Sequence, residues 1–180
     1  NAFMALTTQQ QTAILQLSQV MFNTTPGALF LDVLGTQMVN GKSFSELAQL
    51  LSGTNFFLNK IYNDDFPSRF SQNFVEDFLG NWVSTENKTW AINYIEDKIS
   101  AGATQAEIIS ELTQALSAIP ASDPDWGQAA TNLNTRIAVN IVFRLAGNTI
   151  TGDIAKPVVD AILAQIAAGQ SVGTIIEWAI

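Results

Sequence analysis

The side chains that could do chemistry in this sequence are mainly carboxylates, and they fall in close pairs. The pairs are Asp64-Asp65, Glu76-Asp77, Glu96-Asp97 and Asp123-Pro124-Asp125. An EF-hand calcium loop needs about six to eight oxygen ligands at fixed spacing, and none of these pairs has that spacing. Neighbouring residues on a helix point about 100° apart, so a pair does not converge on one ion unaided. We therefore expect helix caps, solvated faces and a fold without metal, with weak cation binding as the alternative.

The sequence contains no cysteine and no histidine. It therefore excludes zinc sites built on thiolate or imidazole, as well as Ser-His-Asp and Cys-His catalysis. Acid–base catalysis would depend on carboxylates, and spacing alone leaves open a pair of acids of the kind that glycosidases use. We expect no enzyme, no catalytic residue and no cofactor. The alternative is a carboxylate-dependent glycan hydrolase, which a deep cleft holding two facing acids would reveal.

Four tryptophans suggest a different chemistry, the stacking of aromatic rings on sugars. They are Trp82, Trp90, Trp126 and Trp178. Indole rings bury a large area and are favoured in small cores. Structural anchoring is therefore the favoured interpretation, and the phenylalanines between positions 56 and 78 are likewise expected to pack in the core or between the helical units.

The composition limits the possible partners. Only 13% of the residues are charged, and eight Lys and Arg give a net charge of −8. So few cations cannot neutralise a row of phosphates, which argues against nucleic acid and against anionic membranes. The 47% hydrophobic fraction is enough for a folded core, yet no apolar run approaches the roughly 18 residues that span a bilayer. The composition therefore disfavours both nucleic acid and membranes as partners.

The elements that must position these side chains are helices joined by a recurring junction. A glycine ends one helix, and a hydroxyl residue two positions later caps the next. The copies are Gly41-Lys42-Ser43, Gly102-Ala103-Thr104 and Gly169-Gln170-Ser171. The first two continue to Glu46 and Glu107 and so form capping boxes, whereas Thr174 replaces the acid in the third. Thr25, before Pro26, and Thr85 are two further predicted N-caps.

Apolar residues at helical spacing predict an all-α fold without strands. Helices are expected over about 8–23, 25–40, 43–52, 68–79, 85–101, 104–116, 125–146 and 151–168. They group into three long–long–short units, over about 8–53, 68–117 and 125–180, packed as a multi-helix bundle or a short solenoid. A single domain over 4–180 is expected, with residues 1–3 as a remnant of cloning.

Several stretches resemble the N-terminal domain of surface-layer-like and hemolysin-type (RTX) proteins of Gram-negative bacteria. They are Met4–Asn23, Pro26-Gly27, Leu47–Asn55 and Lys88–Tyr94. The Gly-x-Ser/Thr junction is also similar to that of helical DUF4214-type modules. The resemblance covers most of the chain and involves no catalytic motif.

The resemblance implies a non-enzymatic N-terminal module of a secreted surface protein, serving attachment or assembly. The partners it implies are surface polysaccharide, lipopolysaccharide or further copies of the chain. It also implies type I secretion and an extracellular or cell-surface location, with export that needs no N-terminal signal peptide. Relatives of this kind carry calcium-binding Gly-Gly-x-Gly-x-Asp repeats. This sequence has none, so calcium binding is not expected of these residues.

Overall fold

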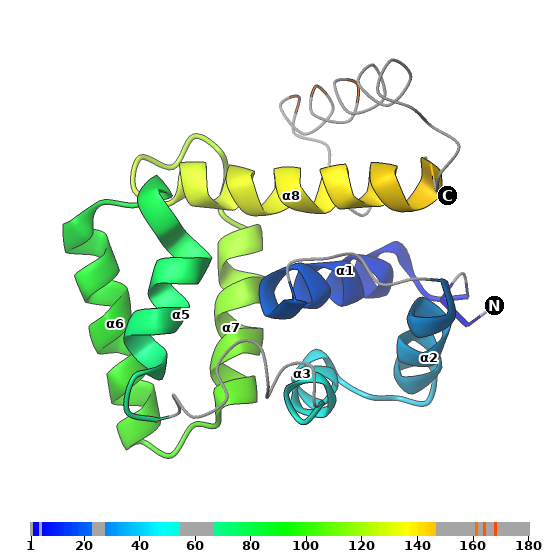
Figure 1. Cartoon of the computed structure of the whole chain (residues 1–180), viewed down its shortest axis with the longest axis horizontal. Helices are drawn as coiled ribbons and strands as arrows, with labels where there is room; N and C mark the ends of the chain where they lie inside the picture. Colours follow the sequence, from blue (N-terminus) through cyan, green and yellow to red (C-terminus); the bar gives the residue numbers. More distant parts are fainter. Residues whose placement is uncertain are drawn as a thin grey trace. The chain divides into compact units, whose positions relative to one another are not determined.

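The computed structural model describes residues 2–3, 5–22, 28–54 and 67–146, together with Ala161, Ala164 and Ala168. Within these residues the chain forms helices and no strand, which confirms the all-α prediction (Figure 1). None of the described helices is both long and apolar enough to cross a membrane. The elements are α1 (Thr8–Phe22), α2 (Ala28–Val39), α3 (Phe44–Ser52), α5 (Phe70–Leu79), the 3-10 helix η1 (Gly80–Trp82), α6 (Thr85–Ser100), α7 (Gln105–Ser117) and α8 (Gly127–Ala146).

The chain divides into two compact units. Unit 1 comprises Asn1–Gln19, Asn23–Lys42 and Leu133–Ile180, and unit 2 comprises Val20–Phe22 and Ser43–Asn132. This division differs from the three consecutive segments that the sequence suggested, because α3 belongs to unit 2 whereas α2 belongs to unit 1. The helix expected over 151–168 lies almost wholly outside the described residues.

In unit 1 the first residues of the chain pack closely on α2. Phe3 is only 2% exposed. A Cβ atom at Gly35 would lie 2.6 Å from the backbone nitrogen of Phe3, so that only glycine allows this approach. The backbone N–H of Ala2 donates to Oδ1 of Asp32 at 2.7 Å. Ala2 and Phe3 are therefore part of the packed structure, and the assignment of residues 1–3 to cloning stays a prediction.

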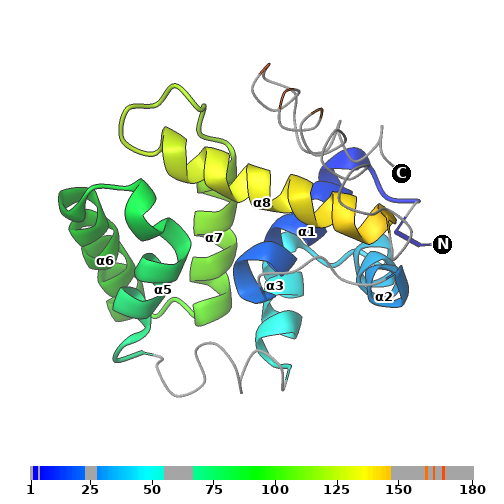
Figure 2. The same ribbon diagram turned by 45° about the horizontal axis from the view of Figure 1, so that its top comes forward.

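In unit 2, α3 packs against α7 and α5 packs against both α6 and η1 (Figures 1 and 2). The apolar stripe predicted for α5 is buried as expected, because residues three and four apart share one face of a helix. Its members are Phe70, Phe74, Val75, Phe78 and Leu79. The rings of Phe70, Phe74 and Phe78 stack in sequence, with centroids 5.3 and 4.9 Å apart.

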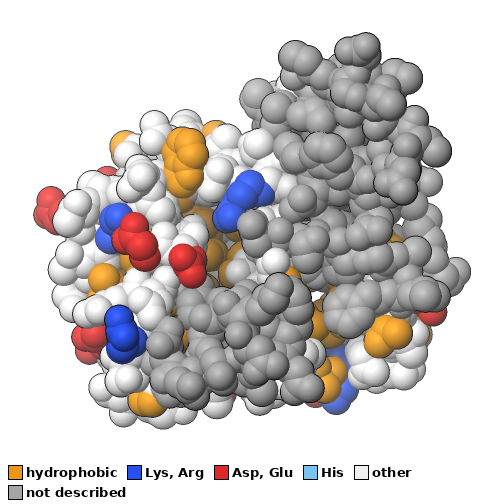
Figure 3. Space-filling view, in the orientation of Figure 1, with side chains coloured by type: hydrophobic (Ala, Val, Ile, Leu, Met, Phe, Trp, Pro, Cys, Tyr) orange, Lys and Arg blue, Asp and Glu red, His pale blue; other side chains and the backbone are white. Residues whose placement is uncertain are grey.

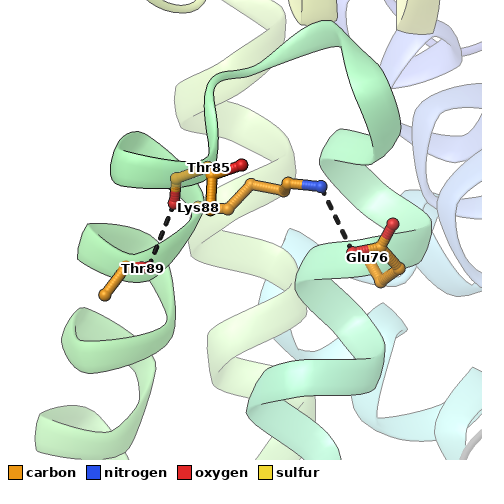
Figure 4. Close-up of polar contacts among 4 residues, drawn as sticks. All are labelled: Glu76, Thr85, Lys88 and Thr89. Atoms are coloured by element: carbon orange, nitrogen blue, oxygen red, sulfur yellow. Dashed lines mark hydrogen bonds and ion pairs between the residues drawn. The ribbon is translucent and has the colours of Figure 1, made fainter.

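Polar side chains also join α5 to α6. Nζ of Lys88 lies 3.3 Å from Oε2 of Glu76 (Figure 4). The hydroxyl of Ser71, which is buried, donates to Oε1 of Glu96 at 3.1 Å. Two of the carboxylates that the sequence placed in close pairs therefore serve as contacts between helices.

Two predicted helix junctions have the predicted hydroxyl cap, and the first of them also has the complete capping box. At the start of α3, Oγ of Ser43 accepts the N–H of Glu46 at 3.1 Å, and Oε1 of Glu46 accepts the N–H of Ser43 at 3.2 Å, which completes a capping box. At the start of α7, Oγ1 of Thr104 accepts the N–H of Glu107 at 3.2 Å. The preceding stops, Gly41 and Gly102, have φ angles of 95° and 93°, in the left-handed region that favours glycine.

The cap predicted at Thr85 is wrong by one position. The N-cap of α6 is Ser84, whose Oγ accepts the N–H of Asn87 at 3.1 Å. Thr85 is the first residue of the helix, and its carbonyl accepts the hydroxyl of Thr89 at 3.0 Å (Figure 4). Ser84 and Thr85 are both good capping residues, and the sequence does not say which one leaves the helical conformation. The predicted junction residues Thr25, Gly169 and Ser171 lie outside the described residues.

Candidate binding surface

Three aromatic rings meet beside α6, and one of them, Trp90, is exposed while Tyr94 and Trp126 are half-buried. Trp90 and Tyr94 are four residues apart, so they lie on the same face of the helix. Their rings stack with centroids 5.4 Å apart and an interplanar angle of 19°. Trp126, from the segment between α7 and α8, packs against Trp90 with centroids 5.7 Å apart and a tilt of 58°. We call Trp90, Tyr94 and Trp126 the aromatic platform.

The loop that carries Trp126 is held by contacts among its own residues. Oδ1 of Asp123 accepts the N–H groups of Asp125 and Trp126, both at 2.9 Å. A Cβ atom at Gly127 would lie 2.3 Å from the carbonyl oxygen of Ala121, which leaves room only for glycine. These contacts hold Trp126 in place before any partner is present.

One side-chain hydrogen bond joins this loop to α6. Nδ2 of Asn87 donates to Oδ1 of Asp125 at 3.3 Å. Asn87 lies three residues before Trp90, on the same side of the helix. The loop is therefore joined to α6 both by the ring contact and by this bond, which places Asp125 at the edge of the platform.

The platform is open to solvent. The side chain of Trp90 is 58% exposed, and that of Trp82, on η1, is 49% exposed. Trp90 and Trp82 are thus not buried in a core, whereas Trp126 is partly buried. Structural anchoring by Trp90 and Trp82 stays a prediction. Trp178 lies outside the described residues.

Three polar side chains contact one another between α6 and α7, namely Tyr94 of the platform, Lys98 and Glu111. We call them the polar trio. The hydroxyl of Tyr94 donates a short hydrogen bond to Oε1 of Glu111. Nζ of Lys98 lies 3.2 Å from Oε2 of the same carboxylate. It also lies 5.5 Å from the centroid of the Tyr94 ring, in a cation–π arrangement. Glu111 is thus held by two donors from α6.

Tyr94 and Lys98 are poorly placed to act as a general base or as a nucleophile. The hydrogen bond to Glu111 raises the pKa of Tyr94, and burial and the negative charge of Glu111 act in the same direction. The hydrogen bond and the charge of Glu111 likewise raise the pKa of Lys98. The phenol and the ammonium both stay protonated at neutral pH, whereas a base or nucleophile needs the deprotonated form.

In the described part of the chain, the predicted carboxylates lie in separate contacts and are not gathered into one group that could hold a metal ion. No group of three or more Asp or Glu side chains there is arranged to hold a metal ion. Asp123 caps the loop before α8, and Glu76 and Glu96 join α5 to α6. Asp64 and Asp65 lie outside the described residues.

Comparison with known proteins does not identify a relative. No protein-family model matches the chain, and no curated protein and no solved structure matches it. The resemblance to surface-layer-like, hemolysin-type and DUF4214-type proteins stays a prediction.

Proposed function

We propose that this chain is a non-enzymatic attachment module that binds surface polysaccharide through the aromatic platform. The observation that carries the proposal is the 58% exposure of Trp90, an indole that is nevertheless held in place by two further aromatic rings. Leaving so much apolar surface in water costs free energy, at about 25 cal/mol per Å². An exposed indole that the fold holds rigid is typical of a binding surface.

The rigidity of the platform favours binding because a fixed side chain loses little conformational entropy when a ligand arrives. Ordering a flexible side chain at an interface costs roughly 0.5–1.5 kcal/mol. Trp90 is stacked on Tyr94, and Trp126 is held through Asp123 and Gly127. Both side chains are therefore ordered before a ligand binds, and binding loses little further conformational entropy.

The polar groups beside the platform support a binding role over a hydrolytic one. Tyr94, Lys98 and Glu111 bind one another, and the raised pKa values of Tyr94 and Lys98 keep both groups protonated. A hydrolase would instead need one carboxylic acid and one carboxylate facing each other across a bound sugar. Glu111 is the one carboxylate of the trio, and its hydrogen bonds hold it among its partners.

The cell-surface location belongs to the same proposal and rests on the resemblance to surface-layer-like and hemolysin-type proteins. The sparse charge supports it weakly. On the face drawn in Figure 3, acidic and basic side chains are interspersed among uncharged ones and form no single-sign field within the described residues. Such a surface fits a partner that offers hydroxyl groups better than one that offers a row of phosphates.

The test is co-sedimentation of the purified chain with insoluble cell-envelope polysaccharide and with lipopolysaccharide vesicles. We expect saturable binding to material that carries polysaccharide, without release of soluble reducing sugar over long incubation. Absence of binding to all of these materials would contradict the attachment role. Steady release of reducing sugar, lost in a variant of one carboxylate, would favour the hydrolase instead.

A further inference from the structure

We infer that the aromatic platform takes a sugar ring without acidic groups, of the type found in β-linked glucose or N-acetylglucosamine polymers. This inference rests on the proposed function and specifies its ligand. It depends on three features of the described residues: the geometry of the rings, the charge around them and the polar groups at their edges.

The ring geometry determines where a ligand can lie. The centroids of Trp90 and Trp126 are 5.7 Å apart, so the two rings touch each other and nothing enters between them. The platform is therefore not a cage around a methylated ammonium group, which would need open space between the rings. A ligand can therefore reach the platform only from its solvent side, where Trp90, at 58% exposed, offers the most surface.

A pyranose with equatorial hydroxyls matches such a flat aromatic face. Its hydroxyls point outward from the rim, and its axial C–H groups leave both faces of the ring apolar. These C–H groups carry slight positive charge and are attracted to the negative face of the indole. When a sugar ring stacks on the indole, apolar surface of both rings is removed from water, and the hydroxyls of the sugar keep their hydrogen bonds.

The charge around the platform is acidic. Asp125 lies at one edge, and Glu86 is exposed and lies one turn before Trp90 on α6. Lys98 is the cation that touches the platform, and its ammonium is paired with Glu111 at 3.2 Å. Uronic acids and phosphorylated sugars would meet like charges here, whereas uncharged sugars would not.

The same carboxylates offer acceptors for sugar hydroxyls. Oδ1 of Asp125 accepts one hydrogen bond from Asn87, and a carboxylate has about four acceptor positions in all. Glu111, at the other end, accepts from Tyr94 and Lys98 and has further lone pairs. Hydroxyls at the rim of a stacked ring can therefore donate to acidic groups near both ends of the platform.

The experiment is isothermal titration of the complete chain with cellohexaose and with the hexamer of N-acetylglucosamine. Polygalacturonate oligomers of similar length serve as the anionic probe. We expect at least one uncharged hexamer to bind at least about tenfold more tightly than the anionic oligomer, with an affinity that salt hardly changes. Binding of the anionic oligomer at equal or higher affinity would overturn the inference.

Two tryptophan variants identify the site. Trp90→Ala should weaken binding of the uncharged hexamer at least about tenfold, the usual size of a central aromatic contact. Trp82→Ala removes an indole that is exposed to a similar extent but lies outside the platform, and it should change the affinity less than about twofold. Equal effects of the two substitutions, or none from Trp90→Ala, would contradict the assignment of the site.

The outcomes separate this inference from the proposed function. If the chain sediments with envelope polysaccharide but binds neither uncharged hexamer, the ligand class inferred here is wrong and the attachment role stands. If it binds no envelope material, both are wrong.

Discussion

Helices α5 and α6 carry similar rows of aromatic residues, and the fold treats them in opposite ways. The rings of Phe74 and Phe78 stack at 4.9 Å with an interplanar angle of 17°, and those of Trp90 and Tyr94 stack at 5.4 Å with an angle of 19°. Phe74 is 1% exposed, whereas Trp90 is 58% exposed. The local geometry of an aromatic row therefore does not determine whether the row serves stability or recognition.

The rest of each helix explains the difference. In α5 the phenylalanines share their face with Val75 and Leu79, and all of these residues are buried. In α6 the buried residues are only Ala91 and Ile95, and half of the other positions are charged or amide side chains. The buried strip of α6 is therefore narrow, and Trp90 lies outside it. Trp and Tyr tolerate this position because each carries a polar group that water can solvate.

The largest effect is expected where the two rows are compared directly. Phe74→Ala should lower the free energy of unfolding by about 3–5 kcal/mol, because it leaves a cavity in a packed row. Trp90→Ala should cost about 1 kcal/mol or less, since it removes ring contacts at the surface. Urea unfolding monitored by circular dichroism measures both. A cost for Trp90→Ala that equals the cost for Phe74→Ala would mean that Trp90 is a structural anchor after all.

The next effect concerns the loop that holds Trp126 against Trp90. Gly127→Ala should cost about 1–3 kcal/mol, because its Cβ would lie 2.3 Å from the carbonyl oxygen of Ala121 and the backbone must shift. Gly53→Ala is the matched control, since its Cβ would meet nothing closer than 3.6 Å. Melting curves compare the two variants. If Gly127→Ala melts like Gly53→Ala, the loop is not fixed as described.

A smaller loss of stability is expected from changes at the N-cap of α6, the helix that carries Trp90. Ser84→Ala should cost about 0.5–2 kcal/mol, because it removes the acceptor for the N–H of Asn87. Thr85→Ala should cost less than about 0.5 kcal/mol, since Thr85 is not the cap. Thermal melting distinguishes them, and the reverse order would move the start of the helix to the position that the sequence suggested.

The smallest effect is the pH dependence of the Tyr94–Glu111 contact. A raised pKa means that the folded chain binds the phenol proton more tightly than the unfolded chain does. The stabilisation is therefore complete below the ordinary tyrosine pKa of about 10 and is lost as pH rises through the higher pKa of the folded state. NMR titration of the Tyr94 ring should give a midpoint above 10, and Glu111→Gln should lower it. Identical midpoints in the unchanged protein and in Glu111→Gln would contradict a hydrogen bond between Tyr94 and Glu111.

Much of the scaffold could be predicted from sequence because it depends on local interactions. The caps at Ser43 and Thr104 and the stops at Gly41 and Gly102 involve residues only a few positions apart. The buried stripe of α5 follows from helical spacing in the same way. These features need no knowledge of the rest of the fold.

The candidate site could not be predicted because it depends on contacts between distant residues. Trp90 meets Trp126, and Asn87 meets Asp125, only when the segment before α8 returns to α6. The sequence showed the tryptophans but not which of them remain exposed. The one local sign of a fixed loop was Gly127, directly after Trp126, because a side chain at this position would collide with the carbonyl oxygen of Ala121.

The most direct test of the difference between the two rows is NMR of the indole N–H groups during titration with the hexamer of N-acetylglucosamine or with cellohexaose. The chain has four tryptophans, so each signal can be assigned by single substitution. We predict that the signal of Trp90 shifts most and that of Trp126 shifts less, while that of Trp82 stays in place. A titration that shifts Trp82 alone, or leaves Trp90 unmoved while the sugar binds, would contradict the assignment of the platform as the binding surface.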